Sequence, residues 1–101
     1  MAQSPTRIVL SHARKMIEDP SHWVQGAWKC PLGDGAFRRC AYQAVHDAAN
    51  EIGLPDLAAL KALARAVGDA RRAPRRVVPA FNDRSSHKEV LALFDLALEK
   101  A

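Results

Sequence analysis

The sequence has few of the residues that cross-link a protein or anchor it in a membrane. Only two of its 101 residues are cysteines, Cys30 and Cys40, which are too few for a disulfide scaffold. No window approaches the ~20 consecutive apolar residues of a membrane span, and the stretch from Met1 to Leu10 lacks an apolar run of signal-peptide length. We therefore expect a cytoplasmic protein with reduced thiols and no membrane partner.

Repeats and low-complexity tracts are also missing, and what remains is an ordinary globular composition. Hydrophobic residues make up 49% of the chain and charged residues 26%. A chain of this length fits one domain and buries roughly two-thirds of the surface that it exposes when unfolded, which is enough for one modest core. The formal net charge of +4 permits an acidic partner without requiring one.

The spacing of apolar residues is helical over most of the chain. The second predicted helix is built largely from small residues, so that a neighbouring helix can approach closely, and Gly53 ends it. The last predicted helix begins with a capping box, in which Glu89 follows three residues after Ser86. We predict an all-α fold, a single small domain over residues 1–101 with two long core-packed loops and four main helices, at 6–19, 36–52, 56–68 and 87–99.

The first long loop is segment 20–35, which holds the only two tryptophans. Each indole can bury about 200 Å², so we expect Trp23 and Trp28 to anchor this loop on the core. A short helical turn at 23–26 and a short hairpin across Gly33-Asp34-Gly35 are both open alternatives, and the hairpin is the less favoured one.

The second long loop is segment 69–85, which contains Pro74 and Pro79. We expect Phe81 to anchor it and the following Asn82-Asp83 pair to serve structure, because Asn and Asp side chains bond nearby backbone groups and form turns.

Several short motifs together resemble a known family. They are W-x-Q-G-A at 23–27, Cys40-Ala41 at a helix start, F-N-D at 81–83 and E-V-L-A-L-F-D at 89–95. The combination resembles a family of short bacterial and phage proteins of unknown function, although Tyr42-Gln43 departs from the Leu-Gly that is usual there. The resemblance implies a small helical domain in which the tryptophan loop, with Trp23 and Gln25, lies near the Asn-Asp loop. It implies no activity.

Arginines are the most concentrated chemical feature. Between residues 65 and 84, six arginines accompany two aspartates, so the whole formal surplus of +4 falls in this stretch. Such a cluster can bind an anionic partner, contacting phosphates through bidentate hydrogen bonds and counterion release. We take Arg71, Arg72, Arg75, Arg76 and Arg84 as the candidate binding residues. A helix-turn-helix-like pair around Gly53 adds a nucleic-acid alternative, although its second helix carries few side chains suited to reading bases.

Thiol or metal chemistry is a third alternative, centred on Cys40. Cys30 and Cys40 could combine with His12, His22 or His46 to bind a metal. Either thiol could also combine with a histidine and with Asp47 or Asp83 to form a nucleophilic set. Their C-x9-C spacing has no matching ligand pair, and Cys40 lies on the small-residue stripe, where a buried packing role is simpler.

The interpretation that we favour is a non-enzymatic module that binds another macromolecule. We expect a protein partner rather than a nucleic acid, and neither a cofactor nor a bound metal. A homodimer is an open alternative.

Overall fold

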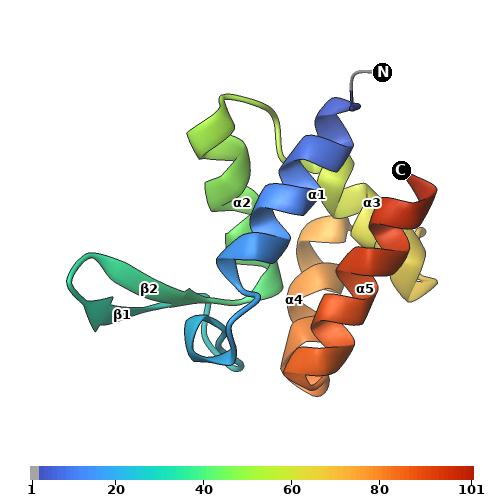
Figure 1. Cartoon of the computed structure of the whole chain (residues 1–101). Coiled ribbons are helices and arrows are strands. Elements are labelled where there is room, and N and C mark those ends of the chain that lie inside the picture. Colours follow the sequence, from blue (N-terminus) through green and yellow to red (C-terminus); the bar gives the residue numbers. More distant parts are fainter. Residues whose placement is uncertain (1–2) are drawn as a thin grey trace.

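The computed structural model describes residues 3–101 and arranges them as a helical body with one projecting hairpin (Figure 1). Its elements are α1 (Pro5–Met16), the 3-10 turn η1 (Pro20–His22), β1 (Lys29–Gly33), β2 (Ala36–Arg39), α2 (Ala41–Ile52), α3 (Leu57–Val67), α4 (Pro74–Arg84) and α5 (His87–Lys100). The expectation of an all-α fold with four main helices was therefore wrong in two places, because the described residues also contain a strand pair and a further helix, α4.

The core lies between the helices. α1 packs along α2, and α3 lies against both α4 and α5. The buried face of α2 consists mostly of alanines, which let α1 approach closely, as the sequence predicted. Larger side chains fill the centre: Val9, Leu10, Ile17, Val45, Leu60, Leu63, Val78, Val90 and Phe94 are all at most 1% exposed.

The helix ends mostly follow the predicted signals. α2 ends at Gly53, whose φ of 80° is in the left-handed region that glycine adopts without a Cβ penalty. The capping box at the start of α5 is confirmed, with the Ser86 hydroxyl accepting from the Glu89 backbone N–H and the Glu89 carboxylate accepting from the Ser86 backbone N–H.

The predicted helix at 36–52 begins only at Ala41, because residues 36–39 form strand β2. β2 pairs antiparallel with β1 through the turn at Gly33-Asp34-Gly35, so the less favoured hairpin is the one that forms. Asp34 and Gly35 have φ of 52° and 78°, the left-handed conformations that a tight hairpin turn requires.

The base of the hairpin is tied to α2 through Asp47. Its carboxylate accepts from Arg39 Nε at 2.6 Å and lies 3.1 Å from Lys29 Nζ. Burial alone would raise the pKa of Asp47, but hydrogen bonds from Arg39, Gln43 and Lys29 outweigh it and lower the pKa. The hairpin therefore projects from a fixed base.

The predicted loop at 69–85 was wrong over most of its length, since residues 74–84 form α4. Pro74 stands in the first turn, where its missing N–H has no helical partner to lose. Pro79 stands inside the helix and removes one backbone hydrogen bond. The burial of Val77, Val78 and Asn82 on one face of α4 offsets that loss.

Candidate functional site

A cluster of hydrogen-bonded polar groups lies where residues 23–26 meet the C-terminal end of α4. Asn82 is fully buried there, at 0% exposure. Its Oδ1 accepts from Trp23 Nε1 at 2.7 Å and from the Ala41 backbone N–H at 2.9 Å, and its Nδ2 donates to the Val24 carbonyl at 3.0 Å. One amide thus joins the tryptophan segment, the start of α2 and the end of α4. We call this cluster the Asn82 junction.

Further hydrogen bonds extend the Asn82 junction toward α5. Gln25 Nε2 donates to the Ser85 carbonyl at 2.6 Å, and the Gly26 N–H donates to Asp83 Oδ1 at 2.9 Å. Among residues 3–101, no buried side-chain nitrogen or oxygen lacks a partner. The polar groups of the junction are therefore used by the fold itself and leave no unpaired buried group for a ligand.

The two tryptophans differ in their surroundings. Trp23 is partly buried against the core, with its ring 5.5 Å from that of His87. Trp28 is 61% exposed, so the expectation that it anchors the loop in the core was wrong. The backbone carbonyl of Trp28 accepts a hydrogen bond from the Cys40 N–H at the base of the hairpin. Its ring lies edge to face with the Tyr42 ring, with the two ring centroids 5.3 Å apart.

Arg75 differs from the other arginines of the cluster. Its guanidinium donates to both carboxylate oxygens of Asp56 at 2.9 Å and to the Tyr42 hydroxyl at 3.1 Å. The Arg75 guanidinium lowers the pKa of Asp56, and the hydrogen bonds that Arg75 donates to Asp56 raise the pKa of Arg75. Arg75 therefore joins α4 to the start of α3, and most of its hydrogen-bonding capacity is used within the chain.

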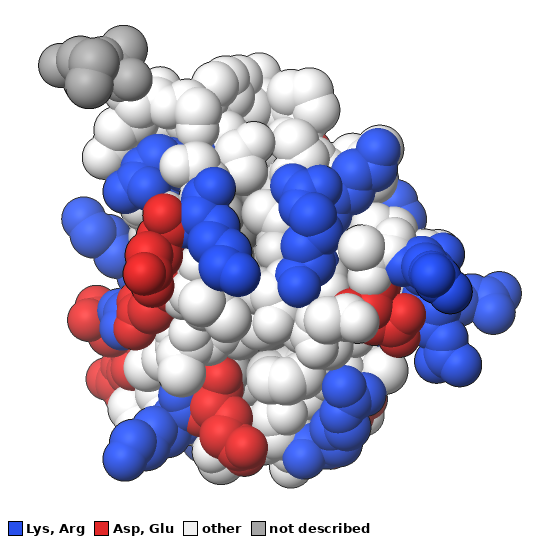
Figure 2. All heavy atoms as spheres, turned by 90° about the vertical axis from the view of Figure 1, so that its right-hand side faces the viewer, with Lys and Arg blue, Asp and Glu red and all other residues white. Residues whose placement is uncertain are grey.

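The remaining arginines of α4 face outward and line a groove, which we call the α4 groove. It has a volume of about 640 Å³ and is lined by Asp69, Arg72, Ala73, Arg76, Val77, Ala80 and Arg84. Arg71 is exposed just before α4 and does not line the groove. On the molecular face drawn in Figure 2, Lys and Arg side chains dominate the right-hand half, and most Asp and Glu side chains lie to the left.

Sequence reasoning missed the floor of the α4 groove. The floor is formed by Ala73, Val77 and Ala80, and the first and last of these are exposed. Their spacing of four and then three residues is helical and could have been found, but the two prolines led us to treat the segment as a loop.

The thiols lie apart from any metal-ligating set. Cys40 is 1% exposed and caps α2, where its Sγ accepts from the Gln43 N–H at 3.4 Å. Burial raises the pKa of the Cys40 thiol, which disfavours the reactive thiolate. Cys30 lies in β1, opposite Arg38 on β2. Among residues 3–101, no three His, Cys, Asp or Glu side chains come together as a metal-binding group.

Comparison with known proteins gives the family. A family model described as a family of unknown function, DUF6197, matches residues 1–100. The chain belongs to DUF6197. No curated protein and no solved structure matches the chain.

Membership of DUF6197 agrees with the resemblance to a family of unknown function that the motifs indicated. The individual motifs and the bacterial or phage origin stay predictions. In this DUF6197 chain, the W-x-Q-G-A and F-N-D segments are hydrogen-bonded to each other at the Asn82 junction. From residue 3 to the last, no helix is long and apolar enough to cross a membrane.

Proposed function

We propose that this protein is a non-enzymatic binding module that captures an acidic segment of another protein in the α4 groove. The observation that carries the proposal is an apolar floor bordered by three arginines, Arg72, Arg76 and Arg84. Arginine is enriched at protein interfaces because its planar guanidinium pairs with carboxylates while its stem covers apolar surface.

The charges of the α4 groove are largely unbalanced. Within residues 3–101, Arg76 and Arg84 have no carboxylate partner, and the Arg84 guanidinium lies over the Phe81 ring at 5.4 Å. Arg72 has only Asp69, at 3.7 Å, and its side chain is 78% exposed. Three arginines against one aspartate leave two positive charges for a partner to neutralise, which favours an acidic occupant.

A protein partner suits the surface better than a nucleic acid. The second helix of the helix-turn-helix-like pair is α3, and it packs against α1, α4 and α5. Its exposed long side chains are Leu57, Lys61 and Arg65, which is a poor set for reading base edges. The apolar floor of the α4 groove would also gain little from phosphates, whereas it would be covered by apolar side chains of a protein segment.

The thiol or metal alternative gains little support from the site. The thiol of Cys40 is buried and has a raised pKa, whereas a catalytic cysteine needs an accessible thiolate.

The test is a fluorescence anisotropy titration with a labelled peptide of Glu, Leu and Ala in irregular order, compared with the same peptide carrying Lys for Glu. We expect the acidic peptide to bind and the basic one not to bind. Arg76→Glu should weaken acidic-peptide binding by roughly tenfold or more.

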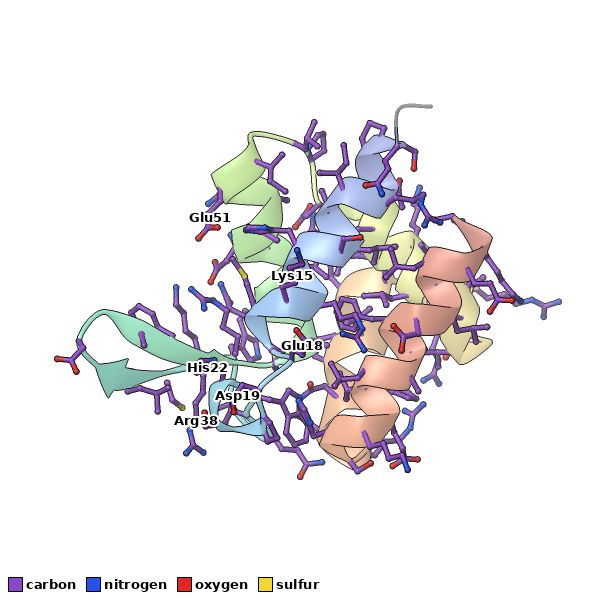
Figure 3. The ribbon with its side chains drawn as sticks, in the orientation of Figure 1. Lys15, Glu18, Asp19, His22, Arg38 and Glu51 are labelled. Carbon is purple, nitrogen blue, oxygen red and sulfur yellow. The ribbon has the colours of Figure 1, made fainter. Side chains whose placement is uncertain are left out.

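The matched control is Lys15→Glu, which makes the same charge change on α1, a helix that contributes nothing to the α4 groove (Figure 3). It should weaken binding by less than about twofold, apart from the general effect of net charge. Equal weakening by both variants would refute a site at the groove. Tighter binding of a random duplex DNA than of the acidic peptide, at two salt concentrations, would favour the nucleic-acid alternative instead.

A further inference from the structure

The residues that line the α4 groove follow the spacing of a helix–helix seam. Ala73, Val77, Ala80 and Arg84 are separated by four, three and four residues. This alternation places them in one row that begins at the N-cap, Ala73, and runs along α4, as the a and d positions of a coiled coil are placed. A row of this kind on an outward face is what a second helix needs to lie alongside.

The floor of the groove allows a close approach. Ala73 and Ala80 present only methyl groups, and Val77, between them, is 5% exposed and forms the bottom. Small side chains let two helix axes come near each other, so that larger side chains of the incoming helix fill the space between them. An extended peptide, whose side chains alternate with a period of two, would match this row poorly.

The length of the groove also sets the length of its occupant. The helical part of the groove runs from Pro74 to Arg84, a rise of about 15 Å at 1.5 Å per helical residue. That distance corresponds to about three turns of a partner helix. Arg76 stands immediately before the floor residue Val77, where flanking charges pair across a helix–helix seam, and Arg72 precedes α4 beside Ala73.

We infer that the α4 groove receives an amphipathic α-helix of a partner protein, about three turns long, with apolar residues at alternating three- and four-residue spacing and acidic residues beside them. This inference rests on the proposed function and specifies the conformation of the bound segment. A second copy of α4 does not fit, because pairing two such faces would bring Arg72, Arg76 and Arg84 against their counterparts.

The experiment compares three labelled peptides of Glu, Leu and Ala, of which the first two have identical composition and the third differs from the first at one position. The first has the seam spacing, the second is scrambled so that no stripe remains, and the third has the seam spacing interrupted by a central proline that breaks a helix. We expect the first to bind at least about tenfold more tightly than either of the others, with a gain of helical circular dichroism on binding. Arg76→Glu should reduce its affinity by roughly tenfold or more, whereas Lys15→Glu should reduce it by less than about twofold.

Each outcome separates the inference from the proposed function. Equal affinity for all three peptides, still reduced by Arg76→Glu, would overturn the helical occupant and leave acidic binding in place. Binding that is insensitive to Arg76→Glu would overturn both. Concentration-dependent association of the protein alone in sedimentation, abolished by Arg76→Glu, would make a second copy the occupant and would also overturn the inference. Unfolding curves for both variants would verify that each is folded.

Discussion

Replacing Asn82 with alanine is the sharpest test of the architecture. The side chain is fully buried and serves the Trp23 indole N–H, the Ala41 backbone N–H and the Val24 carbonyl. Asn82→Ala would leave these three groups without a partner inside the protein. Each unsatisfied buried group costs about 1–3 kcal/mol, and partial exposure near Trp23 argues for the lower half of that range.

The expected loss for the three groups together is therefore about 3–6 kcal/mol of unfolding free energy. That is a large share of the roughly 5–15 kcal/mol that holds a domain of this size together. At about 4–8 °C for each kcal/mol, Tm should fall by about 12 °C or more.

The assay is urea and thermal unfolding, followed in parallel by far-UV circular dichroism and by tryptophan fluorescence. The control is Asp83→Ala at the neighbouring position, which removes the exposed bond from the Gly26 N–H and a long contact with Asn82. It should cost about 1 kcal/mol or less. A loss below about 1 kcal/mol for Asn82→Ala, or equal losses for the two variants, would refute the view that this amide joins the three segments.

Three further predictions concern other parts of the fold. Trp28→Ala should lower the free energy of unfolding by less than about 1 kcal/mol, because the ring is mostly exposed. Trp23→Phe lacks the indole N–H that is bonded to Asn82 and should cost more in the same urea unfolding assay. The reverse order would contradict the view that Trp23, and not Trp28, anchors this segment. The pKa of Asp56 is lowered in the folded state, so its contribution to the free energy of unfolding is fully present above its unfolded pKa of about 3.9 and is lost as the pH falls through the folded value. Unfolding midpoints measured between pH 5 and pH 2 should therefore fall less steeply for Asp56→Asn than for the wild type. Parallel curves for the two proteins would contradict this. Alkylation of the native protein, followed by mass spectrometry of its peptides, should show Cys30 modified well before Cys40, because Cys40 is buried and its pKa is raised. Faster labelling of Cys40 would instead support the thiol alternative.

The helices that carry strong periodicity and end signals could be predicted from the sequence. The small-residue stripe of α2, its glycine end and the capping box of α5 each depend on residues within a few positions of one another. Local spacing is enough to identify such features, because the helix itself brings those residues together.

Predictions failed where distant residues decide the conformation. Pro79 is unfavourable inside a helix when considered alone, and only the burial of Val78 and Asn82 shows why α4 continues through it. Residues 36–39 become a strand because they pair with β1 and because Asp47, on α2, holds Arg39. Trp28 was placed in the core from its size, but the hairpin directs it outward. The candidate groove was missed for the same reason as α4, since its floor exists only when that segment is helical.

The Asn82 junction also has a consequence for the order of folding. The bonds that Asn82 makes to Ala41 and Trp23 join residues 41 and 59 positions apart in the chain. Closing such long loops costs entropy before any contact compensates for it, so these bonds form late relative to the individual helices. During synthesis, the tryptophan segment has no fixed place until residue 82 has left the ribosome, and a chain truncated before that point would leave the Trp23 indole in water.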